Sequence, residues 1–119
     1  MKQNAETTDE FIRQNVASGK KYCLLLLKAG PKLNQPPPAE AERIRMEHLR
    51  HTFQMRAEGK LLINGPVLDD TELRAIGIFN TTDKEEVKKF MERDPAVKAG
   101  WFKYEIYLWF GIPGDSLPK

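Results

Sequence analysis

The chain has 119 residues, of which 40% are hydrophobic and 30% charged, a composition typical of one globular domain that excludes fibrous and wholly disordered classes. Its net charge of +2 does not predict a basic groove for nucleic acid. A single cysteine, Cys23, excludes an internal disulfide, and the longest uncharged apolar run, residues 22–27, is too short to span a membrane. Because the first twenty residues lack the apolar segment of a secretory signal, we expect a cytoplasmic protein with no nucleic-acid or membrane partner.

The N-terminal residues 1–20 are polar and predict an extension that precedes a domain over residues 21–119. Thr8 or Asp9 is a suitable N-cap for a short helix, which Gly19 would end. A mobile tail is the alternative interpretation of this segment.

The next residues predict a strand, a loop and a long helix. Residues 21–28 are a short apolar run flanked by lysines, which is typical of a strand buried on both faces. Residues 32–38 include Pro36, Pro37 and Pro38 and predict an extended loop beside a site. Residues 39–58 contain no glycine or proline and predict a helix. On a helical wheel its apolar side chains form two arcs, and we expect both to be covered: Leu49, Phe53, Met46 and Ala57 in one, and Ile44, His48, Met55, Ala41 and Thr52 in the other.

The second half of the chain predicts a hairpin, a helix and a last strand. Residues 61–67 and 73–80 are strand-like, with a bend or bulge at Gly65-Pro66. Thr82 to Glu85 has the pattern of a capping box that opens a helix, and Asp94-Pro95 begins a short turn or helix that ends at Gly100. Residues 101–110 alternate as a strand, and a polar tail follows from about residue 111.

This order, β-α-β-β-α-β, predicts an α+β fold of the ferredoxin-like type, with a four-stranded antiparallel sheet and two helices on one face. In the last strand the side chains of one face are apolar and aromatic, as expected for a face that packs against the helices. The side chains of the opposite face include both charged groups and large aromatic rings: Trp101, Lys103, Glu105, Tyr107 and Trp109. Because so aromatic a face is rarely left exposed, we expect a homodimer that packs sheet against sheet. A pocket lined by these rings in a monomer is the alternative.

Few residues are candidates for chemistry. His48 and His51 have a spacing that can place two imidazoles on one metal, but no carboxylate joins them and no nucleotide-binding motif is present, so we expect neither a metal nor a cofactor. Cys23 is most simply a core residue. His48 shares a helix face with apolar side chains, which is compatible with a hydrogen-bonded core histidine or with a functional base. Asp94 has the position of a helix cap, and spacing alone does not place it beside His48.

Two segments carry a resemblance to a known family. They are EHLRHTFQMRAEGKLLINGPV, residues 47–67, and GIFNTTDKEEVKKFMERDPAVKAGWFKYEIYLWF, residues 77–110. The order of His-Leu, Gly-Pro, Asp-Pro, Ala-Gly and a last aromatic strand resembles the YciI-like (YCII-related) family. The resemblance covers roughly residues 21–110, and the N-terminal extension and the loop at Pro36–Pro38 depart from the family pattern.

The resemblance implies a dimeric α+β barrel with a His–Asp pair in a pocket beside the sheet. The histidine corresponds to His48 and the acid to Asp94, while Gly65 and Pro66 correspond to a Gly-Pro that lines the pocket. It further implies a cofactor-independent proton transfer of the lyase, isomerase or dehydrohalogenase type on a small cyclic or aromatic-derived metabolite. Such a substrate suits walls built from aromatic side chains, for which the candidates are Trp101, Tyr107 and Trp109. A non-enzymatic module that binds a small molecule in the same pocket is the alternative function, and a haem-handling barrel is a third hypothesis.

Overall fold

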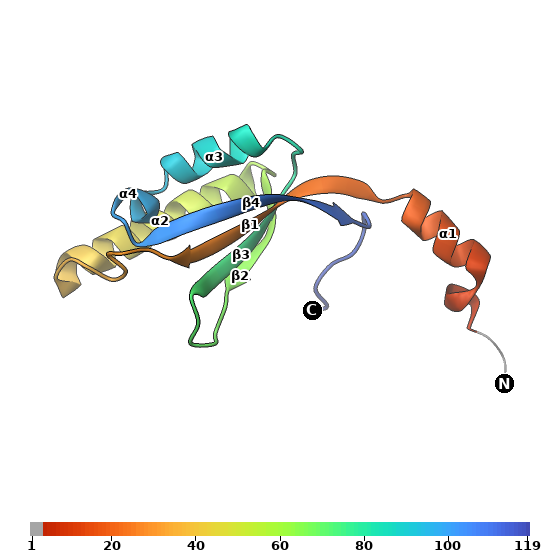
Figure 1. Cartoon of the computed structure of the whole chain (residues 1–119), viewed down its shortest axis with the longest axis horizontal. Coiled ribbons are helices and arrows are strands. Elements are labelled where there is room, and N and C mark those ends of the chain that lie inside the picture. The colour runs from red at the N-terminus through yellow and green to blue at the C-terminus, as the bar shows by residue number, and fades with distance from the viewer. Residues whose placement is uncertain (1–3) are drawn as a thin grey trace.

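The computed structural model describes residues 4–119 (Figure 1). A short 3-10 helix, Ala5–Thr7, leads into the regular elements. In chain order these are α1 (Asp9–Ala17), β1 (Lys20–Ala29), α2 (Pro38–Ala57), β2 (Leu61–Pro66), β3 (Leu73–Phe79), α3 (Lys84–Glu92), α4 (Pro95–Lys98) and β4 (Phe102–Gly111). Within the described part of the chain, no helix has the length and apolar character needed to cross a membrane.

The four strands form one antiparallel sheet in the order β2-β3-β1-β4, and α2 and α3 cover one of its faces (Figure 1). This is the ferredoxin-like arrangement that the element order predicts, and the α+β fold class is therefore confirmed. The bulge in β2 lies at Leu62, between the paired residues Leu61 and Ile63, rather than at the predicted Gly65-Pro66.

Strand β1 crosses the centre of the sheet and supplies much of the core. Its side chains alternate strictly: Cys23, Leu25 and Leu27 are buried under the helices, and the side chains between them are half-buried on the other face. The prediction of a strand buried on both faces is thus wrong for a single chain, because the helices cover one side only. The core beneath them is completed by side chains from α2, β2, β3 and α3: Met55, Leu61, Phe79, Val87, Phe90 and Met91.

Cys23 lies in this core without any exposed surface, and burial raises the pKa of its thiol. Because the thiolate is the reactive form, we expect Cys23 to resist a thiol reagent such as a chromogenic disulfide at pH 8. One thiol per chain should react within minutes in denaturant and less than about a hundredth as fast in the native protein, since reaction then requires opening of the core. Rapid labelling of the native protein would contradict this placement.

The helix ends follow the sequence with one exception. Thr8 caps α1 by accepting a hydrogen bond from the Phe11 amide, and Gly59 follows α2 with a φ of 72°, a conformation that glycine adopts at no steric cost. The predicted capping box at Thr82 is wrong: Asp83 is the N-cap of α3 and accepts from the Glu85 amide at 3.0 Å. Thr81 accepts from the Asp83 amide and so fixes the turn one residue later than the pattern predicts.

Trp101 is not part of the strand, and its predicted position on the aromatic sheet face is wrong. The chain turns at Gly100, whose φ is 80°, and the Trp101 amide donates to the Ala96 carbonyl at 2.9 Å. This turn directs the indole toward α2, where Trp101 is only 2% exposed and its Nε1 donates to the Gln35 carbonyl. The strand alternation therefore begins at Phe102 and not one residue earlier.

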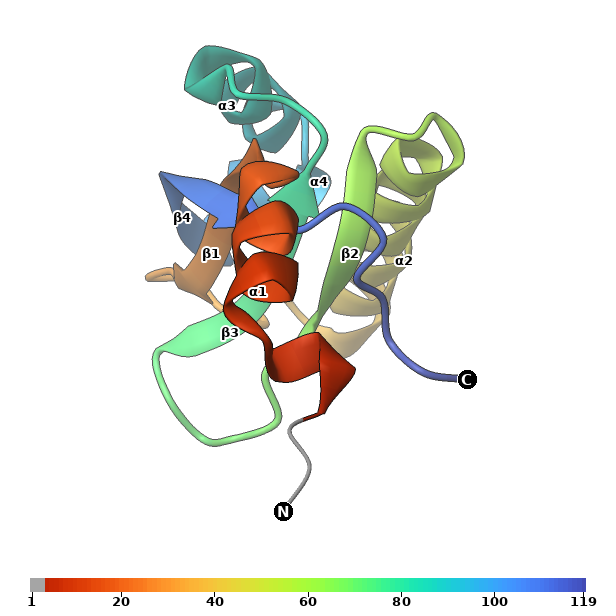
Figure 2. The same ribbon diagram turned by 90° about the vertical axis from the view of Figure 1, so that its right-hand side faces the viewer.

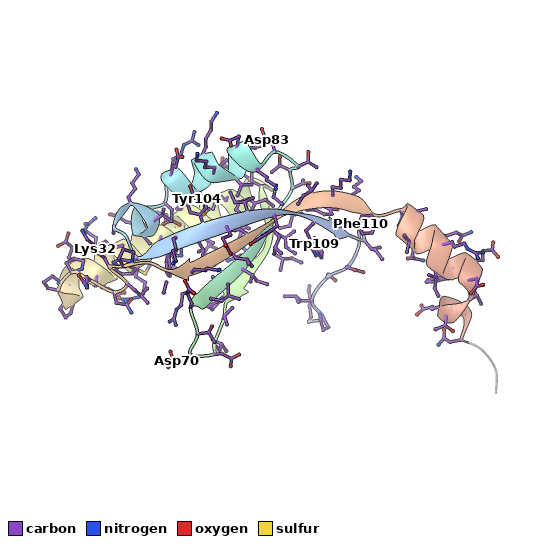
Figure 3. The ribbon with its side chains drawn as sticks, viewed as in Figure 1. Lys32, Asp70, Asp83, Tyr104, Trp109 and Phe110 are labelled. Carbon is purple, nitrogen blue, oxygen red and sulfur yellow. The ribbon has the colours of Figure 1, made fainter. Side chains whose placement is uncertain are left out.

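Among residues 4–119, three apolar surfaces with several neighbouring exposed side chains are candidates for contacts with other molecules. The first is the open sheet face, the side opposite the helices, formed by Tyr22, Leu24, Leu26, Ile76, Ile78, Tyr107 and Trp109. In Figure 3, Tyr104 lies on the side of α3 and Trp109 on the opposite side of β4. The second is one of the two predicted arcs of α2, which we call the α2 stripe: Met46, Leu49 and Phe53. The third is the apolar side of α1, a helix that extends away from the sheet in Figure 1 and faces the viewer in Figure 2.

Candidate active site

A cavity of about 250 Å³ lies between α2 and the sheet. Its walls are largely apolar and come from both layers, among them Leu25, Leu27, Met55, Leu61, Phe79 and Phe102. His48 and Asp94 also line it, and they place an imidazole and a carboxylate in largely apolar surroundings, to which Thr52, Asn64 and Arg74 add polar groups. A small apolar cavity with few polar groups is the usual form of a small-molecule site.

His48 is positioned by the buried side of α2. Ile44, one turn earlier, packs in a cluster with Ala41, Ala96 and Trp101, and Thr52, one turn later, is buried. Residues one turn apart share a helix face, so these contacts also direct His48 toward the sheet. There its ring lies 5.5 Å from the ring of Phe102, and its side chain is 19% exposed.

Asp94 is positioned by α4, which it caps. Its Oδ1 accepts a hydrogen bond from the Ala96 amide at 2.8 Å, and Pro95 occupies the first turn of the helix. Ala96 and Trp101 hold α4 against the first half of α2. The same cluster therefore fixes both elements, and this is why two residues 46 positions apart in the sequence meet.

The two side chains form a close hydrogen-bonded pair. His48 Nδ1 lies 2.9 Å from Oδ1 and 2.7 Å from Oδ2 of Asp94. Asp94 is only 1% exposed. Because Oδ1 already accepts from an amide, the carboxylate acts as an acceptor and Nδ1 carries the hydrogen. His48 Nε2 forms no hydrogen bond within residues 4–119, and every fully buried side-chain nitrogen or oxygen there has a partner, so Nε2 remains accessible with its lone pair free.

His51 is engaged elsewhere. Its Nε2 lies 2.9 Å from the Phe90 carbonyl oxygen, on the α3 side of α2, where it joins the two helices. Over the described stretch 4–119, no three histidine, cysteine, aspartate or glutamate side chains are grouped as metal ligands would be.

The structure separates the predicted site residues into three groups. Trp101 packs with Ala41, Ile44 and Ala96 between α2 and α4 and does not line the cavity. Gly65 and Pro66 line the cavity that holds His48 and Asp94. Tyr107 and Trp109 lie on the open sheet face, on the other side of the sheet. Trp109 instead contributes to a second cavity of about 440 Å³ between that face and the C-terminal tail.

Three further residues line the cavity of the pair without having been predicted for it: Asn64, Arg74 and Phe102. Phe102 belongs to the strand set that the alternation directs toward the helices, so that pattern contained its signal. Asn64 follows the bulge at Leu62 on the edge strand β2, and Arg74 lies on β3 beside a second register shift, between Leu27 and Lys28 of β1. Nothing in the sequence marks either shift.

The chain matches the model of the YCII-related domain over residues 21–110 and belongs to that family. Among solved structures it is similar to 5-chloro-2-hydroxyhydroquinone dehydrochlorinase (TftG) from Burkholderia phenoliruptrix, in a complex with 2,5-dihydroxybenzoquinone. The two share 24% sequence identity and a TM-score of 0.52, with 73% of this chain and 92% of that one covered, a likeness that shows the fold. No curated protein sequence matches the chain.

Proposed function

We propose that this protein is a small enzyme that transfers a proton to or from a cyclic or aromatic-derived metabolite, without a cofactor, and that His48 is its base. The observation that carries the proposal is the pair itself: Asp94 engages Nδ1 of the imidazole and leaves Nε2 free at an apolar cavity. Membership of the YCII-related family and the likeness to a dehydrochlorinase favour an elimination among the possible reactions.

In such an elimination His48 Nε2 accepts a proton from an O–H or C–H group of the ring. The electron pair of that bond forms a new double bond, and the leaving group, chloride in a dehydrochlorination, departs with the electrons of its own bond. The imidazolium that forms is stabilised by Asp94, and it returns the proton to water when product leaves. Gly65 and Pro66 present backbone to the substrate, and Phe102 offers an aromatic wall.

The test is a panel of chlorinated and unchlorinated hydroxyhydroquinones, followed by chloride release and by mass spectrometry in D₂O. We expect one chloride ion to be released for each product molecule formed from a chlorinated compound. With an unchlorinated analogue, we expect deuterium to be incorporated, because His48 Nε2 exchanges a proton with the ring. If compounds of the panel bind but neither release chloride nor incorporate deuterium, the proposal of an enzyme is contradicted and a module that only binds the ligand is favoured.

The proposal includes a homodimer that buries the open sheet face. The centre of this face is apolar, and at one end Lys28 donates a hydrogen bond to Glu105 at 2.8 Å. This bond holds the pKa of the Glu105 carboxyl below its usual range, so the ion pair persists at neutral pH and is lost as the pH falls through that lowered value. An apolar centre beside a charged edge is typical of an interface.

We expect Tyr107→Arg to weaken the dimer at least tenfold, because it places an unpaired charge in the middle of the apolar surface. Light scattering across a micromolar concentration series measures the mass. Lys88→Ala, on the exposed side of α3, is the control and should leave the mass unchanged. A wild-type mass of one chain at all of these concentrations would refute the dimer.

A further inference from the structure

Helix α1 is an amphipathic helix whose apolar side is left uncovered by residues 4–119. Its apolar side chains, Phe11, Ile12 and Val16, are all exposed, Val16 to 55%. The hydrogen bonds and the ion pair of α1 join residues of the N-terminal segment to one another. A nine-residue helix, about 13 Å long, is marginal in water by itself, so its stability requires a surface that covers the apolar side.

The chain cannot bring α1 to its own α2. Lys20, where β1 begins, is paired with Gly111, and only Ser18 and Gly19 connect this fixed point to α1. Two residues span about 7 Å at most. The molecule is 61 Å long, α1 lies at one end of it, and α2 lies along the other half (Figure 1).

The α2 stripe has the properties of a surface that receives a helix. Met46, Leu49 and Phe53 follow one another at spacings of three and four along the outer side of α2, and Phe53 is 62% exposed. The guanidinium of Arg56 lies 5.5 Å from the Phe53 ring centre. A row of this kind matches the apolar side of a second amphipathic helix.

The charges around the two surfaces are complementary. Arg43 and Arg45 have glutamate partners on α2, whereas Arg50 and Arg56, on the two sides of the stripe, form no ion pair within residues 4–119. In the N-terminal segment Glu6 has no basic partner in that range, and Glu10 accepts only a Gln14 amide hydrogen bond. Arg56 donates a hydrogen bond to Asn64 Oδ1 at 2.7 Å but keeps its charge beside the stripe. The N-terminal segment is acidic by comparison, because Glu6, Asp9 and Glu10 outnumber its one arginine, Arg13, over residues 4–19.

We infer that α1 of a second copy of this chain packs on the α2 stripe, with its apolar side on Met46, Leu49 and Phe53. A reciprocal exchange of this kind closes a two-fold pair. Leu49 also lines the cavity of His48 and Asp94, so the partner's helix lies along the mouth of that cavity. The contact is separate from the sheet-to-sheet dimer, and either can fail without the other.

The test is disulfide trapping between two differently tagged full-length chains. One chain carries Val16→Cys, and the other carries either Met46→Cys, at one end of the stripe, or Ala57→Cys, one turn beyond Phe53 at the other end, so that either direction of packing is detected. Cys23 does not compete because it is fully buried. We expect a mixed-tag dimer on a non-reducing gel, at one of the two positions, at least tenfold above the yield with Lys88→Cys on the exposed side of α3.

A second substitution distinguishes packing from random collision. Phe53→Ser in the chain that carries the α2 cysteine removes the largest exposed ring of the stripe, and the yield should fall at least fivefold. An unchanged yield, or a yield no higher than with Lys88→Cys, would overturn the inference. If Val16→Cys is trapped by Tyr107→Cys instead, α1 covers the open sheet face of the partner, and the α2 contact is wrong while the sheet dimer stands.

Discussion

His48→Gln is expected to lower turnover by about 10²- to 10⁴-fold, the usual contribution of a positioned general base. Glutamine keeps a polar side chain on the buried side of α2 but has no lone-pair nitrogen that takes up a proton near neutral pH. Binding of the substrate should change much less, because the apolar walls of the cavity are retained. Chloride release or deuterium incorporation measures turnover, and calorimetry of an unreactive quinone measures binding.

His51→Gln is the matched control on the same helix. The His51 ring is held by the Phe90 carbonyl, away from the cavity of the pair, so its loss should leave turnover within about twofold. An active His48→Gln variant, or equal losses for the two variants, would remove His48 from the role of base.

Asp94→Asn should leave the fold nearly unchanged and yet inactivate the enzyme by about 10²-fold or more. The asparagine oxygen still accepts from the Ala96 amide, but its NH₂ group takes the place of the oxygen that lies 2.7 Å from His48 Nδ1. A donor at this position makes Nδ1 the acceptor and moves the ring hydrogen to Nε2, which then has no lone pair for substrate. The ¹⁵N shifts of the His48 ring report this change of tautomer directly, while those of His51 should not move.

Asp94→Ala adds a large loss of stability to the same loss of activity. It removes the helix cap, worth about 1 kcal/mol, and leaves the Ala96 amide and the imidazole without their buried acceptor, at about 1–3 kcal/mol more. Urea unfolding measures the sum. Asp83→Ala is the control, because Asp83 also caps a helix through an amide two residues on but is exposed and has no histidine partner, so it should cost only about 1 kcal/mol.

If His48 keeps the titration and the tautomer of the wild type in the Asp94→Asn variant, then Asp94 is only a helix cap. The alternative of a binding module would then gain support, since the pocket would remain and the base would not be oriented.

The sequence predicts the elements well because each depends on nearby residues. The apolar run of β1, the Thr8 cap and the stop at Gly59 are local signals, and the helical wheel identifies the buried side of α2 that carries His48. The helix cap at Asp94 is local as well. The hydrogen bond between Asp94 and His48 is not, because it depends on how α4 packs on α2 through Trp101.

The incorrect predictions likewise concern features that the nearby residues do not determine. A period of two extends the last strand back through Trp101, but a turn at Gly100 interrupts the strand there. The positive φ of one glycine cannot be derived from such a period. The wheel of α2 gave two apolar arcs, and one of them is exposed, because amphipathicity alone does not distinguish a core from a surface that meets another molecule.

One carboxylate both starts α4 and holds the imidazole of His48, and this makes local unfolding of α4 and loss of the His48–Asp94 pair a single event. When the first turn of α4 opens, the Ala96 amide is released to solvent and Asp94 is no longer held toward His48. Hydrogen exchange at the Ala96 amide therefore measures, in the absence of any ligand, the fraction of molecules in which Asp94 no longer holds the His48 ring. A ligand that docks against His48 should slow this exchange in proportion to its affinity, so a single amide can serve to screen for substrates.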